Sequence, residues 1–225
     1  MDQPTDPVAR QLALTALTTE HFNLQTARMG TIAEANGRAT LYLGTLSSAV
    51  IALAFVGQAN QLGDSFYLFA LLLPPVFLLG VFSYLRLVQT SIEDMVYALG
   101  SFRIRQYFLG LDPAAAPFFP PTDPQGMTKL ERIGVVATGP LQMLLTAASM
   151  VGCIDAIVGG VAVALAVRSL LAASVPVAAV TGTLVALGLA ALCFGYQVRR
   201  FRRAAAAVPE LYEGQSPDMP GWPTA

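Results

Sequence analysis

The stretch Leu41–Ala59, LYLGTLSSAVIALAFVGQA, carries no charged residue and decides the fold class of this chain. A helix needs ~20 predominantly apolar residues to cross the hydrocarbon core of a bilayer, so the stretch is typical of a membrane-spanning helix. Three further apolar stretches of similar length follow it. Strands of a membrane β-barrel would instead alternate polar and apolar residues. We therefore predict an all-α, polytopic membrane protein with four transmembrane helices that form a four-helix bundle.

The composition of the whole chain agrees with a membrane protein. Its 225 residues are 55% hydrophobic and only 12% charged, and the mean hydropathy is +0.59. Soluble domains carry about 25% charged residues. A net charge of −1 argues against a nucleic-acid partner, because such proteins normally present a basic face. We expect the lipid bilayer to be the main partner of this chain.

Charged and proline-rich stretches divide the chain into seven segments. We expect the segments that flank the first and second spans to extend these two helices into the cytoplasm as a paired helical stalk, because the residues next to the spans lack proline. The segments are a cytoplasmic N-terminal helix (1–38), the first span (39–59), the second span (66–88), a cytoplasmic helix with a proline-rich linker (89–139), the third span (140–167), the fourth span (174–198) and a basic anchor with a proline-rich tail (199–225).

The positions of arginine and lysine predict the orientation. Of the 13 basic residues, only Arg168 lies near the face opposite the others. The positive-inside rule then places both termini in the cytoplasm. Twelve arginines against one lysine suggest a GC-rich bacterial genome, so we expect a bacterial cytoplasmic membrane. The cluster after the fourth span is predicted to anchor the topology and to contact anionic lipid; it comprises Arg199, Arg200, Arg202 and Arg203.

Small residues repeat every four positions along the third span. Such a face lets another helix approach closely, because helix association in lipid depends on van der Waals packing. Two hypotheses remain open: the face holds the four helices of one chain together, or it forms an oligomer interface. The residues are Ala148, Gly152, Ala156, Gly160 and Ala164.

Asp155 lies beside this repeat, near the middle of the predicted third span. An ionisable group inside a membrane costs ~2.5–3.5 kcal/mol on insertion scales, and it is therefore a candidate functional site. It would coordinate a proton or cation. Alternatively, it is a structural tether to Gln58, Thr181 or Thr183, or the span is shifted so that it lies nearer the outer interface.

Pro74 and Pro75 lie inside the second span. Proline lacks an N–H group and clashes with the carbonyl four residues earlier, so the pair predicts a kink. Transporters use such breaks as hinges, although membrane helices also tolerate proline without a functional reason. We carry the pair forward as a candidate hinge.

Catalytic and metal-binding motifs are missing from the sequence. His21 is the only histidine and has no nearby cysteine, which makes a metal site a poor explanation for it. We find no P-loop, GxSxG or HExxH motif. The sequence therefore predicts a protein that is not an enzyme and that needs no cofactor or metal.

Two stretches carry a resemblance to known proteins. EHFNLQTAR at 20–28 and IAEANGR at 32–38 resemble a group of uncharacterised small actinobacterial integral membrane proteins with four helices. In architecture alone, the chain is also similar to the SMODS-associated multi-helix membrane effectors of bacterial defence. That second resemblance implies oligomerisation and membrane disruption after a cytoplasmic signal.

These observations support two functional hypotheses. The first is a homo-oligomeric, non-enzymatic membrane protein whose cytoplasmic helices sense a signal or a protein partner, with a role as a pore-forming effector. The second is a small proton- or ion-coupled transporter or channel that uses Asp155.

Overall fold

The computed structural model describes residues 7–59, 62–119 and 143–212. These residues form four α-helices and one short 3-10 helix, and no strand occurs among them. The elements are α1 (Pro7–Ala59), α2 (Leu62–Leu111), η1 (Pro113–Phe118), α5 (Ala147–Leu170) and α6 (Val175–Tyr212). All four α-helices are long and apolar enough to cross a membrane. The prediction of an all-α protein with four such helices is confirmed.

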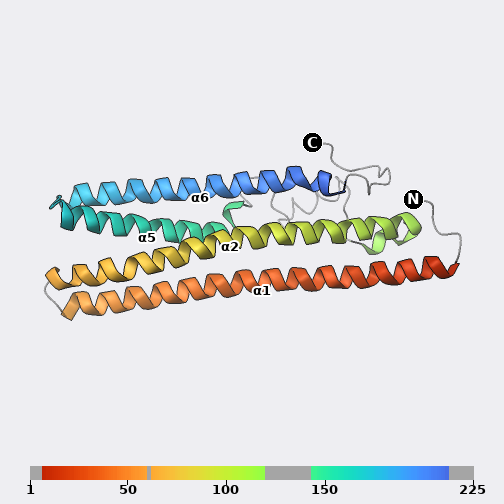
Figure 1. Ribbon diagram of the computed structural model, residues 1–225, viewed down its shortest axis with the longest axis horizontal. Helices are drawn as coiled ribbons and strands as arrows, with labels where there is room; N and C mark the ends of the chain where they lie inside the picture. Colours follow the sequence, from red (N-terminus) through yellow and green to blue (C-terminus); the bar gives the residue numbers. More distant parts are fainter. Residues whose placement is uncertain (1–6, 60–61, 120–142, 213–225) are drawn as a thin grey trace.

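Helices α1 and α2 are much longer than a bilayer crossing requires. They contain 53 and 50 residues, which at ~1.5 Å per residue makes each of them roughly 75–80 Å long. The hydrocarbon core of a bilayer is only about 30 Å thick. Each helix runs without interruption from its apolar part into its more polar part, and the two lie side by side as an antiparallel pair (Figure 1).

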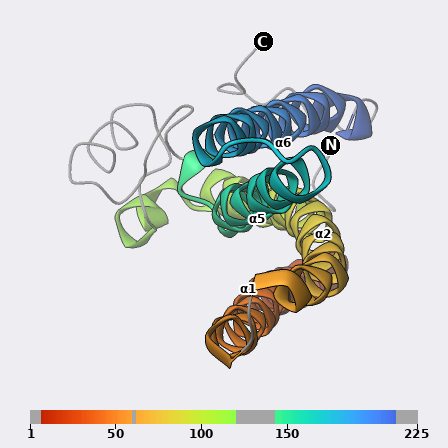
Figure 2. The same cartoon turned by 90° about the vertical axis from the view of Figure 1, so that its left-hand side faces the viewer.

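The four helices of the predicted bundle lie in an open, curved row. Figure 2 shows α5 between α6 and α2, with α1 on the far side of α2. The row leaves broad apolar surfaces uncovered by protein; Phe55, Leu71 and Leu184, for example, are each more than 60% exposed. Such surfaces are what lipid tails cover in a membrane protein.

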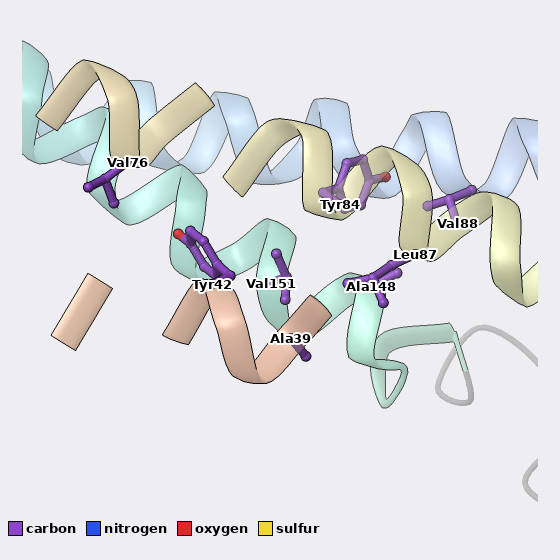
Figure 3. Close-up of a cluster of buried hydrophobic side chains, with 8 residues drawn as sticks. All are labelled: Ala39, Tyr42, Val76, Tyr84, Leu87, Val88, Ala148 and Val151. Atoms are coloured by element: carbon purple, nitrogen blue, oxygen red, sulfur yellow. The ribbon is translucent and has the colours of Figure 1, made fainter. Parts of the chain in front are cut away.

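The largest buried cluster lies where the α1–α2 pair meets α5 (Figure 3). Its side chains come from all three helices, so it joins the α1–α2 pair to α5, which itself packs against α6. The members are at most 8% exposed, and they are Ala39 and Tyr42 of α1, Val76, Tyr84, Leu87 and Val88 of α2, and Ala148 and Val151 of α5.

Local residues explain where the helices begin and end. The Thr146 side chain accepts a hydrogen bond from the Ser149 N–H and so caps the start of α5 at Ala147. After α5, Ala172 adopts a left-handed conformation with φ 51°, which turns the chain into α6. Asp112 and Pro113 follow the last residue of α2. The predicted linker beyond residue 119, and the tail from residue 213, lie outside the described residues.

Candidate functional site

A buried hydrogen bond joins Tyr42 of α1 to Asp155 of α5. The Tyr42 hydroxyl donates to Asp155 Oδ1 over 3.1 Å. Tyr42 is 0% exposed and Asp155 is 4% exposed, so water does not compete for this bond. The second carboxyl oxygen, Oδ2, has no hydrogen-bond partner within the described part of the chain. Asp155 therefore ties two helices together and still has one oxygen free to bind a ligand.

Gly80 of α2 makes room for this contact. A Cβ atom at position 80 would lie 2.0 Å from Asp155 Oδ1 and 2.8 Å from Tyr42 Cε2. Only glycine lets the α2 backbone approach both side chains so closely. The site is consequently built from one residue on each of three helices.

Asp155 lies closer to one end of the membrane helices than the sequence suggested. It is eight residues after the first residue of α5, Ala147, and 15 before the last, Leu170. On α1, Tyr42 follows Arg38 by four residues, and on α2, Gly80 precedes Arg86 by six. At ~1.5 Å per residue, the site is therefore only roughly 6–9 Å along the helices from a layer of charged residues.

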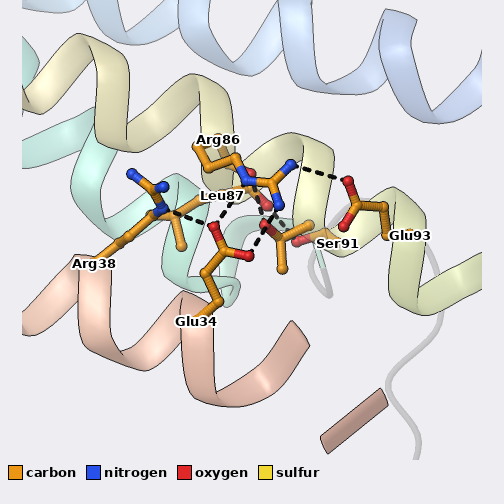
Figure 4. Close-up of polar contacts among 7 residues, drawn as sticks. Glu34, Arg38, Arg86, Leu87, Ser91 and Glu93 are labelled. Atoms are coloured by element: carbon orange, nitrogen blue, oxygen red, sulfur yellow. Dashed lines mark hydrogen bonds and ion pairs between the residues drawn. The ribbon is translucent and has the colours of Figure 1, made fainter. Parts of the chain in front are cut away.

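This charged layer is an ion-pair network between α1 and α2 (Figure 4). Arg86 donates to both carboxyl oxygens of Glu34, at 2.8 and 2.9 Å, and to Glu93 at 2.9 Å. Arg38 also donates to Glu34, at 2.9 Å. Glu34 precedes the first predicted span, and the hydrogen bonds from Arg86 and Arg38 lower its pKa from 4.5 to about 2. Glu34 is therefore ionised at neutral pH.

A second ion pair extends the contact between α1 and α2 by two turns. Arg28 Nε lies 2.9 Å from Asp94 Oδ1, and the Thr31 hydroxyl lies 3.5 Å from the same oxygen. The Glu34–Arg86 and Arg28–Asp94 ion pairs together hold α1 and α2 in a single register over the part of the pair that continues beyond α5.

A polar cluster of neutral side chains ties α5 to α6. Gln197 of α6 is 1% exposed. Its Oε1 accepts from the Ser149 hydroxyl at 3.0 Å, and its Nε2 donates to Thr146 Oγ1 at 3.1 Å. The Gln197 amide thus joins α6 to the polar side chains at the start of α5, and hydrogen bonds of this kind hold helices together in an apolar environment.

A pocket of about 200 Å³ lies next to Asp155, between α2 and α6. We call it the Asp155 pocket. Apart from Asp155 itself, its walls are apolar or aromatic. They are formed by Val81, Tyr84 and Leu85 of α2 and by Leu192, Cys193 and Tyr196 of α6.

The small-residue repeat of the third span packs inside the protomer. Ala148 is 1% exposed and Ala156 is 3% exposed. A Cβ at Gly152 would lie 3.0 Å from the Tyr84 ring, and one at Gly160 would lie 2.5 Å from the Gly182 carbonyl oxygen. Of the two hypotheses for this face, the structure agrees with packing within the chain. Ala164 takes part, since its Cβ would lie 2.7 Å from a Cβ at Gly182.

The remaining predicted site residues do not contact Asp155. Helix α2 continues through Pro74 and Pro75, both of which are exposed, and their role as a hinge stays a prediction.

Helix α6 continues to Tyr212, so the four arginines of the predicted lipid anchor lie within the helix and not after its end. Arg199, Arg202 and Arg203 are exposed, as a lipid anchor requires, whereas Arg200 is partly buried. Among the described residues, no group of three or more acidic, histidine or cysteine side chains is placed to hold a metal ion.

Comparison with known proteins adds no relative. No protein-family model, curated protein or solved structure matches this chain. The resemblances described above therefore stay hypotheses, and the functional argument depends on the contacts of the chain itself.

The sequence pointed to Asp155 but not to its partners. Tyr42 reads as an ordinary aromatic residue in an apolar stretch, and only its three-dimensional position gives it a role. Gly80 was visible as a lone glycine in the second span, which can mark a close approach of another chain segment. Gln197 was visible in the sequence as a polar amide near the end of the fourth apolar span, but its burial was not.

Proposed function

We propose that this chain is a non-enzymatic, homo-oligomeric protein of a bacterial cytoplasmic membrane that converts a cytoplasmic signal into a change in its membrane helices. The observation that carries the proposal is the Tyr42–Asp155 hydrogen bond. It connects the α1–α2 pair to α5 through buried polar atoms. Movement of the pair would break or make this bond, and the opening of a pore would be the output.

In this proposal the ends of α1 and α2 that continue beyond α5 project into the cytoplasm as a stalk. Their length supports this placement, because neither helix fits within a bilayer. The Glu34–Arg86 and Arg28–Asp94 ion pairs support it too, since they make the stalk move as one body. A signal or protein partner at the stalk would therefore act on Tyr42 directly.

The exposed face of α1 is where a second copy would pack. Gly30, Gly37 and Gly44 occur at intervals of seven residues, and a Cβ atom at any of them would meet no atom within 4 Å. Phe22 and Met29, which are also seven residues apart on α1, are 66% and 69% exposed. An apolar surface outside the membrane favours association with another protein surface. The oligomer would thus use α1, because the small-residue face of α5 is already covered.

Conversion of Tyr42 to phenylalanine tests the relay. Overproduction of the wild-type chain is expected to let propidium iodide enter cells, because mass action populates the assembled pore. Tyr42→Phe removes only the donor hydroxyl, and dye entry should fall roughly tenfold if the bond couples the two helix pairs.

The matched control is Tyr97→Phe on α2, since the Tyr97 hydroxyl has no hydrogen-bond partner among the described residues. This variant should behave like the wild type. A wild-type chain that inserts normally without admitting dye, or a Tyr42→Phe variant that admits as much dye as the wild type, would refute the relay.

The second candidate function is a small proton- or ion-coupled carrier or channel. The unpaired Oδ2 of Asp155 favours it, because a carboxyl oxygen beside a pocket can exchange a proton or a cation. An apolar cluster of Leu53, Leu73 and Val158 lies farther along the helices from the charged layer than Asp155 does. A carrier would have to open this cluster during each cycle.

Proton uptake into proteoliposomes, followed with a pH-sensitive dye, decides the carrier hypothesis. Asp155→Asn should abolish uptake, whereas Asp112→Asn, at an exposed site after α2, should leave it unchanged. Equal uptake by Asp155→Asn and wild type would exclude a carrier that depends on Asp155.

A further inference from the structure

The Asp155 pocket combines a carboxyl group with apolar walls. Asp155 has no ion-pair partner among the described residues, and Oδ2 accepts no hydrogen bond from them. A carboxylate in an apolar environment is costly unless a proton or a cation neutralises it. The site therefore has chemistry for a positively charged ligand, and it disfavours an anion.

Two aromatic rings form the walls of the pocket on opposite helices. The rings of Tyr84 on α2 and Tyr196 on α6 are 6.3 Å apart between centroids and tilted by 56°. The Tyr84 hydroxyl donates to the backbone oxygen of Cys193, which fixes this ring against α6. Tyrosine faces attract cations that come within about 6 Å of the ring centroid. The two rings therefore favour a positively charged ligand, as the Asp155 carboxyl group does.

The size and the surroundings of the pocket restrict the ligand further. Its volume of about 200 Å³ is below the ~300–1,000 Å³ of typical ligand pockets, so the ligand must be small. Leu192 at the mouth is 71% exposed and lies in the fourth apolar span. A ligand that reaches the pocket from this side must carry apolar surface that can contact lipid.

We propose that the Asp155 pocket binds a small hydrophobic organic cation, such as an ammonium group that carries one aromatic or short alkyl substituent. The positive centre lies against Asp155 Oδ2 and the tyrosine rings, and the apolar substituent packs on Val81, Leu85 and Leu192. A bound cation would lie beside the Tyr42–Asp155 bond, so its presence acts on the contact between the two helix pairs. This binding activity is independent of whether the chain forms a pore.

Benzyltrimethylammonium is the probe, and the full chain in lipid nanodiscs is the target. Binding is measured by saturation-transfer NMR, with the neutral isostere neopentylbenzene as the comparison ligand. We expect saturable binding of the cation by the wild-type chain and no saturable binding of the isostere. Asp155→Asn keeps the acceptor for Tyr42 and removes the charge, so the affinity should fall at least about tenfold, which corresponds to ~1.4 kcal/mol.

Two variants at the protein surface keep the test independent of folding. Leu192→Trp fills the mouth of the pocket from the exposed side and should weaken binding as strongly as Asp155→Asn. Leu187→Trp places the same side chain at a 62% exposed position of α6 that does not line the pocket, and it should bind like the wild type. Absence of saturable binding by the wild type, equal binding of the neutral isostere, or unchanged affinity in Asp155→Asn or Leu192→Trp would each overturn the proposal.

Discussion

Replacing Gly160 with alanine is expected to lower the free energy of unfolding by roughly 1–3 kcal/mol, and leucine should prevent stable pairing of α5 and α6. A Cβ at position 160 would lie 2.5 Å from the Gly182 carbonyl oxygen and 2.7 Å from Ala186 Cβ. The carbonyl belongs to the α6 backbone and cannot rotate away, so the two helices must separate. Unfolding of the detergent-solubilised chain by SDS measures the loss.

Gly188→Ala is the matched control for Gly160→Ala. It lies on α6, and a Cβ there would meet no atom within 4 Å. Alanine has a helix propensity about 1 kcal/mol better than that of glycine, so this variant should be neutral or slightly stabilised. Equal stabilities of Gly160→Ala and Gly188→Ala would contradict the close backbone contact. A Cβ at Gly152 or Gly160 would meet residues of the same chain. Leucine at either position therefore disturbs the fold of one chain, and such a variant does not measure its assembly.

Gly80→Ala is expected to produce a comparable loss of stability, roughly 1–3 kcal/mol, by a different route. The new methyl group would occupy the position of the Asp155 carboxyl group, which must then move away from Tyr42. The new methyl group would clash with the Asp155 side chain and not with a backbone atom. The loss of stability should therefore depend on which residue occupies position 155.

A double-mutant cycle separates this effect from a general defect of α2. In an Asp155→Ala background, the cost of Gly80→Ala should fall by ~0.5–3 kcal/mol, the range observed for residues in contact. Gly44→Ala on α1, where a Cβ meets open space, should show the same small effect in both backgrounds. A Gly80→Ala cost that is the same with Asp and Ala at position 155 would show that the two residues do not share this space.

The charge distribution along the chain was enough to predict the membrane helices but not their arrangement. The stretch at 41–59 lies within α1, and the other three predicted spans likewise fall largely on α2, α5 and α6. Apolar composition shows that a helix suits lipid, but it does not say which helices are neighbours, so it cannot distinguish a row from a closed bundle. The pairing of α5 with both α6 and α2 became visible only in the structure.

The small-residue repeat illustrates the same limit at the level of single residues. Its four-residue spacing predicted a close helix contact, and Gly160 makes one with Gly182. The spacing could not say whether the neighbouring helix belongs to the same chain, because any helix with small residues satisfies the same packing requirement.

What the sequence by itself determined is the set of helices that suit a membrane and the one acidic residue, Asp155, that is out of place among their apolar residues. Both follow from the free energy of moving individual side chains from water into lipid, which is a property of local composition. The tertiary structure decided which residues surround Asp155. Tyr42 is 113 positions away in the chain, and its contact with Asp155 depends on the rotation and register of three helices. Those are set by the packing of all the side chains between them, and no local pattern encodes them.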